Sequence, residues 1–145
     1  MDFKYIFAVA LLTVLLGGGC ETTGSDRRPV TDLAGTSWLA TDIGGKGIAD
    51  GVRSTLTFTE PGKVAGSGGC NRFFGAVTMD GPSIEFGKMG STIMACPPPL
   101  MEQEARYLDA LGEGKRFEVR DGILLLFSDG PDPIVRFLKI ETAPE

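Results

Sequence analysis

A ten-residue stretch from Gly66 to Gly75 constrains the fold of this chain more than any other part of the sequence. It holds four glycines, one cysteine and two phenylalanines. A glycine-rich run in a strand context is typical of a bulge or of a close approach between backbones, because glycine tolerates positive φ and adds no side chain. Cys70 lies in this stretch, and Cys96 is the other cysteine that follows residue 20. The two thiols are therefore candidates for a cross-link that ties the stretch to the start of a following helix.

The first 19 residues have the pattern of a bacterial export signal. A positive charge precedes the uncharged apolar run 6–16, which as a helix would be about 16 Å long, too short for a typical bilayer core. Small residues then precede Cys20, as in the lipobox of bacterial lipoproteins, although Gly17 stands where that pattern usually has leucine. We predict a signal peptide over residues 1–19, lipidation of Cys20 and a flexible tether over residues 20–32. An ordinary cleaved signal peptide with an incidental cysteine is the alternative.

Export and lipidation together predict a location. The lipid on Cys20 would hold the protein on a membrane of the cell envelope, facing the periplasm. Glu21 follows that cysteine in place of the aspartate that retains many lipoproteins in the inner membrane, which favours the outer membrane.

In this oxidising compartment a disulfide between Cys70 and Cys96 is the expected state. It would contribute about 3 kcal/mol to stability if it acts by restricting the unfolded chain. A redox-active pair is the alternative, but the two cysteines are not arranged as Cys-x-x-Cys, and no histidine or lysine neighbours them in the sequence.

The composition argues against several classes of function. The sequence contains no histidine, which excludes Ser-His-Asp and Cys-His catalysis and nearly all catalytic zinc sites. The net charge of −5 and the scattered basic residues argue against a nucleic-acid surface. The run Gly66–Gly69 lacks the Lys-Ser/Thr ending of a phosphate-binding Walker loop. We therefore expect no catalytic residue, no metal, no cofactor and no nucleic-acid partner.

Short strands separated by turns account for most of the remaining chain. Residues 53–59 alternate, with Leu56 and Phe58 on one face, and a strand near the start of the domain carries Trp38 as a core residue. Hairpin turns are predicted at two Asp-Gly pairs, residues 80–81 and 121–122. A last strand is predicted over residues 134–140.

One helix is predicted, starting at the prolines 97–99 and ending at Gly112 or Gly114. Its apolar positions fall at helical spacing: Met101, Ala105, Leu108 and either Leu111 or Gly112. Glu102 and Glu104 are expected in its first turn, and they point to different sides of the helix, so they do not form an acid/base pair. These elements predict an α+β domain over residues 33–141, with a strongly curved antiparallel sheet or partly closed β-barrel and one amphipathic helix.

The sequence resembles the META domain family, whose HslJ-like members are bacterial heat-shock lipoproteins. The most specific matches are Gly69-Cys70-Asn71 and the segment Thr92-Ile93-Met94-Ala95-Cys96, and the resemblance covers residues from about 33 to 140. It implies a small α+β envelope protein associated with stress or antibiotic tolerance. It implies no enzymatic activity and carries over no catalytic residue.

We therefore predict a non-enzymatic binding or scaffolding protein with an envelope protein as its partner. The candidate binding surface is Asn71, Arg72, Phe73 and Phe74. One alternative is a periplasmic thiol-redox protein that uses Cys70 and Cys96. Another is an inhibitor of a protease or lysozyme-type hydrolase, which would insert the two phenylalanines into an active site.

Overall fold

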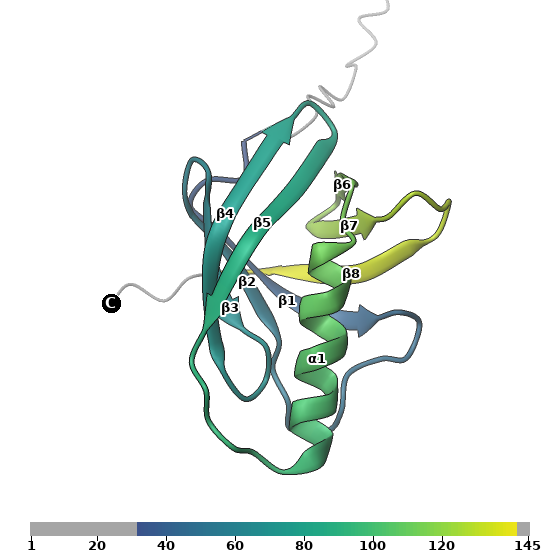
Figure 1. Ribbon diagram of the computed structural model, residues 1–145. Coiled ribbons are helices and arrows are strands. Elements are labelled where there is room, and N and C mark those ends of the chain that lie inside the picture. The colour runs from purple at the N-terminus through teal and green to yellow at the C-terminus, as the bar shows by residue number, and fades with distance from the viewer. Residues whose placement is uncertain (1–31, 142–145) are drawn as a thin grey trace, which may run out of the picture.

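Eight antiparallel strands and one helix make up the part of the chain that the computed structural model describes, residues 32–141 (Figure 1). The strands are β1 (Thr36–Ile43), β2 (Thr55–Glu60), β3 (Lys63–Ser67), β4 (Arg72–Asp80), β5 (Ser83–Ser91), β6 (Arg116–Arg120), β7 (Ile123–Phe127) and β8 (Pro133–Ile140). Each strand pairs with the next along the chain, and β8 pairs with β1, so the sheet closes into a barrel. The helix α1 (Pro98–Gly112) lies between β5 and β6 in the sequence. This confirms the predicted fold class. The predicted signal peptide, Cys20 and nearly all of the tether lie outside the described residues.

Tight turns join the hairpins near the positions that the sequence predicts. Asp121 and Gly122 have φ values of 50° and 76°, so both take the left-handed conformation that a type I′ hairpin turn requires. The turn between β4 and β5 is shifted by one residue from the prediction. Asp80 ends β4, Gly81 and Pro82 form the turn, and β5 begins at Ser83.

Alternate residues of the strands and one face of α1 fill the interior. Trp38, Leu56 and Phe58 are buried, as predicted. Tyr107 of α1 is fully buried and makes edge contacts with two strand residues, Phe73 and Phe137, at ring-centroid distances of 6.0 and 6.2 Å. These aromatic contacts fix the helix against the barrel core.

The buried face of α1 differs from the predicted one. The buried residues are Gln103, Glu104, Tyr107 and Leu111. Met101 is 41% exposed, Ala105 is exposed and Leu108 is half-buried. The helix begins at Pro98, so neither Glu102 nor Glu104 lies in its first turn, where they were expected. The polar side chains face inward because α1 packs partly against backbone groups of loops, which require hydrogen-bond partners.

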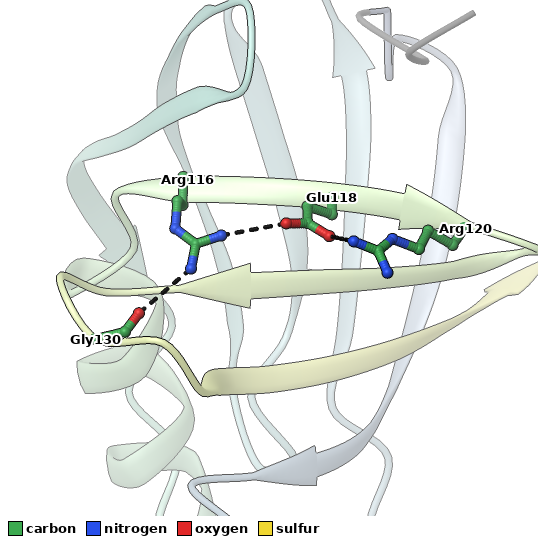
Figure 2. A network of polar contacts seen from close by, with 4 residues as sticks. All are labelled: Arg116, Glu118, Arg120 and Gly130. Carbon is green, nitrogen blue, oxygen red and sulfur yellow. Dashed lines mark hydrogen bonds and ion pairs between the residues drawn. The ribbon is translucent and has the colours of Figure 1, made fainter. Parts of the chain in front are cut away.

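Strands β5 and β6 meet at one end only. Their one register pair is Ser83 with Arg116. The Arg116 guanidinium lies 3.8 Å from the centre of the Phe127 ring and donates to the Glu118 carboxylate and to the Gly130 carbonyl oxygen, at 3.3 and 3.4 Å (Figure 2). Glu118 also pairs with Arg120 on the same outer face of β6. This network links β6 to β7 and to the loop that follows β7.

The buried phenol of Tyr107 generates a pH prediction. Burial raises the pKa of Tyr107 well above its ordinary value of 10.0, because an ionised phenolate would lose its hydration in the core. The folded protein keeps this proton while the unfolded chain releases it. The free energy of unfolding is therefore unaffected by this group below about pH 10 and falls above it, by up to about 1.4 kcal/mol per pH unit.

Urea unfolding of the wild type and of Tyr107→Phe at several pH values up to about 11 checks this. The variant loses the hydrogen bond from the phenol to the Thr55 carbonyl oxygen, 3.0 Å long, and should be less stable near neutral pH. Above about pH 10 its stability should fall less steeply than that of the wild type. Equal slopes in that range would contradict the assignment.

Candidate functional site

The carboxylate of Glu104 is the centre of a buried polar cluster between α1 and the loop before β4. Glu104 is 7% exposed, and its Oε2 accepts hydrogen bonds from the backbone N–H groups of Cys70, at 3.0 Å, and of Asn71. Its Oε1 accepts from the side-chain amide of Asn71 at 2.7 Å. A Cβ at Gly68 would lie 2.5 Å from the Glu104 Cγ, so this close approach requires glycine. The glycine-rich stretch thus brings the backbone against α1.

The side chain of Asn71 connects this cluster to the segment that follows β5. Its Oδ1 accepts from the Met94 N–H at 2.7 Å and from the Thr92 hydroxyl at 3.1 Å. Its amide nitrogen donates to Glu104. Asn71 is buried, and both ends of its amide are in use. Asn71 therefore connects Glu104 of α1 to residues 92 and 94 through hydrogen bonds.

A disulfide attaches the same segment at its other end. Cys70 and Cys96 are bonded, with an S–S distance of 1.97 Å and a Cα–Cα distance of 6.0 Å, which confirms the predicted cross-link. Residues 92–97 form neither helix nor strand. We call residues 92–97 the anchored loop, because Asn71 holds its first half and the disulfide holds Cys96.

The anchored loop presents apolar side chains to solvent. Ile93 is 97% exposed and Met94 is 53% exposed. Phe74, on the outer face of β4, is 64% exposed, and its ring lies over Gly90, where a Cβ would come within 3.0 Å of it. Ile93 and Met94 are therefore two adjacent apolar side chains exposed on one loop.

The predicted binding surface is only partly accessible. Asn71 and Phe73 are buried, whereas Arg72 and Phe74 face solvent. Successive side chains of a strand point to opposite faces, so neighbouring residues of β4 cannot share one surface. The prediction is therefore wrong for Asn71 and Phe73. Sequence reasoning also missed Ile93 and Met94, although the cysteine two residues after Met94 marks the loop that carries them.

A shallow cleft of about 620 Å³ lies along another side of α1, where Lys46, Glu102 and Arg106 contribute to its lining. The buried Gln103 also reaches it, but both ends of its amide are bonded: the oxygen accepts from the Ala49 N–H at 2.6 Å, and the nitrogen donates to the Ser54 hydroxyl at 3.1 Å. The cleft offers opposite charges and no unpartnered buried group for a ligand.

Residues 32–141 offer neither a metal site nor a membrane-spanning helix. No group of three or more potential metal-ligating side chains lies close together there. No helix in that part of the chain is long and apolar enough to span a membrane.

The Glu104 cluster generates a stability prediction. In Glu104→Gln, the amide has one oxygen where the carboxylate has two, so its NH₂ group must face either the two backbone N–H groups or the Asn71 amide. In either orientation an N–H of the new amide faces another N–H donor, and neither finds an acceptor. This should lower the free energy of unfolding by about 1–3 kcal/mol. Glu102→Gln is the matched control, because Glu102 is exposed on the same helix, and it should change stability by less than about 0.5 kcal/mol. Denaturant unfolding measures both, and equal stability of the two variants would refute a central role for Glu104.

Solved structures with this fold include proteins of low sequence identity. An NMR structure of a protein from Burkholderia xenovorans is 29% identical, with a TM-score of 0.63, and the match covers 76% of this chain and 85% of that one. A second NMR structure is 22% identical, with a TM-score of 0.59 and coverages of 73% and 90%. The crystal structure of a DUF4847 family protein from Bacteroides vulgatus is 17% identical, with a TM-score of 0.58 and coverages of 75% and 95%. The last two likenesses concern the fold alone.

None of the curated proteins matches this chain. The family model of the META domain matches residues 31–141, which include every strand, the helix, the disulfide and the anchored loop. The chain therefore belongs to the META domain family.

Proposed function

We propose that this protein is a non-enzymatic, lipid-anchored module of the cell envelope that binds a partner protein through the anchored loop. The observation that carries this proposal is the exposure of Ile93 and Met94 on a segment that Asn71 and the disulfide hold in place. The resemblance to heat-shock lipoproteins supports a role in envelope stress or antibiotic tolerance. The N-terminal pattern ending at Cys20 supports the lipid anchor.

The attachments of the loop favour binding energetically. Ordering a flexible backbone costs about 1–2 kcal/mol per residue, and a loop that is already held avoids most of this cost when a partner docks. Full burial of an isoleucine side chain contributes about 1.5–3 kcal/mol. A fixed loop can therefore convert the burial of Ile93 and Met94 into affinity.

Inhibition of a hydrolase is a second candidate, because a disulfide-closed loop with an almost fully exposed isoleucine can fill an active-site cleft. Of the two phenylalanines that were expected to insert, Phe73 is buried and Phe74 is 64% exposed, and the more exposed Ile93 is the first inserting residue to test. Assays against envelope proteases and lysozyme-type enzymes test this candidate. Inhibition by the wild type that Ile93→Asp abolishes would establish it.

Photo-crosslinking in bacteria that express the full chain tests the binding role. A photoreactive residue at Ala95 in the anchored loop should yield discrete adducts with an envelope protein. One at Asp129, which is exposed in the loop between β7 and β8, should not. Ile93→Asp should reduce the Ala95 adducts by roughly tenfold or more, because burial of the isoleucine is lost.

The control substitution is Leu138→Asp. Leu138 is an exposed apolar residue on β8, 48% exposed, and lies outside the anchored loop. This variant should keep the adducts, and thermal unfolding should show that both variants remain folded. Adducts that persist in Ile93→Asp, or that disappear equally in Leu138→Asp, would show that the loop is not the binding site.

A further inference from the structure

Strand β5 has a backbone partner on one side along its length and on the other side at one end only. It pairs with β4 from Ser83 to Ser91. On the opposite side its pairing with β6 is limited to Ser83 with Arg116, next to a backbone bond from the Ile84 N–H to the Lys115 carbonyl oxygen. Figure 1 shows β6 and β7 near the last turn of α1, while β5 runs on toward the first turn of the helix. Within the described barrel, no other strand pairs with the second half of β5 on this side.

The register identifies which backbone groups face this open edge. The Thr92 N–H donates to the Arg72 carbonyl oxygen of β4 at 2.9 Å, and Ser91 lies opposite Phe73. Hydrogen-bonding directions alternate along an antiparallel strand, so the N–H groups of Met89 and Ser91 point away from β4. No hydrogen bond found among residues 32–141 occupies either of these two donors.

The open edge is accessible and leads directly into the anchored loop. Gly87, Lys88 and Ser91 are exposed. Helix α1 also contacts β5, and these three residues stay exposed beside it. The strand ends at Ser91, two residues before Ile93, so a polypeptide that lies along the edge also reaches the exposed apolar side chains.

We infer that the edge of β5 from Gly87 to Ser91 accepts an extended segment of the partner protein as an additional strand. This inference rests on the proposed binding function and specifies its mode. Unpaired N–H and C=O groups in a row are complementary to another extended backbone. The segment would contribute about five residues, with apolar side chains at alternate positions near Met89 and Ile93.

Peptides selected from a phage-displayed library of random short sequences, with the full chain as the target, provide the probe. In the complex, hydrogen exchange at the amides of Met89 and Ser91 should slow at least roughly tenfold, because both become bonded. Each selected peptide is then resynthesised with a single N-methyl group at every backbone position in turn. Methylation at every second position should weaken binding roughly three- to tenfold, and the intervening positions should tolerate it.

A pair of substitutions at Ser91 separates the backbone donor from the side chain. Ser91→Pro removes the N–H that faces the open edge and should abolish peptide binding. Ser91→Ala keeps that N–H, so strand addition predicts retained binding, whereas recognition of the hydroxyl predicts loss. If Ser91→Pro unfolds, the N-methyl series still decides, because it uses the wild-type chain.

The inference would be overturned if no selected peptide slowed hydrogen exchange at the amides of Met89 and Ser91, or if the effects of N-methylation did not alternate along the peptide. It would also be overturned if exchange at these amides slowed with rising protein concentration in the absence of peptide. That result would indicate a second copy of this chain at the edge. Failure here is distinguishable from failure of the proposed function. Adducts at Ala95 that depend on Ile93, combined with no period of two, would leave loop binding intact and exclude strand addition.

Discussion

The buried carboxylate of Glu104 links the parts of this structure that lie far apart in the sequence. It receives two backbone N–H groups and one amide, from Cys70 and Asn71, and in the described part of the chain no basic side chain pairs with it. A buried carboxylate with fewer donors would be strongly destabilising. The cluster therefore requires α1, the glycine-rich stretch and the start of β4 to keep one arrangement. The anchored loop depends on that arrangement through the side chain of Asn71.

The polar cluster and the aromatic core hold different parts of α1 in place. Tyr107 and Leu111 pack into the barrel and supply the apolar burial. Glu104 and Gln103, closer to the start of the helix, bind loop backbone. The helix thus packs against β5 and β8, and backbone pairing of Ser83 with Arg116 joins β5 to β6 at one end. Strands β5 and β6 are paired at the start of β5, whereas the end of β5 has no strand partner on that side and leads into the anchored loop.

Local patterns were enough to predict most of the fold. The alternation at Leu56 and Phe58 and the Asp121-Gly122 turn depend on residues close in sequence, and the disulfide follows from a compartment argument. The buried face of α1 could not be predicted in the same way. Periodicity assigns glutamate to solvent, and only the folded chain shows that Glu104 faces two N–H groups 33 and 34 residues away. The exposure of Ile93 was missed for a related reason, because apolar residues are expected inside.

The central claim is that the Glu104–Asn71 cluster and the disulfide hold residues 92–97 in one conformation before any partner binds. Backbone NMR order parameters of Ile93 and Met94 in the free protein test this most directly. Values near those of the strands, about 0.85, are expected for a loop held at both ends. Values below about 0.6 would mean that the loop is flexible, and would contradict the claim that its exposed side chains form a fixed binding surface.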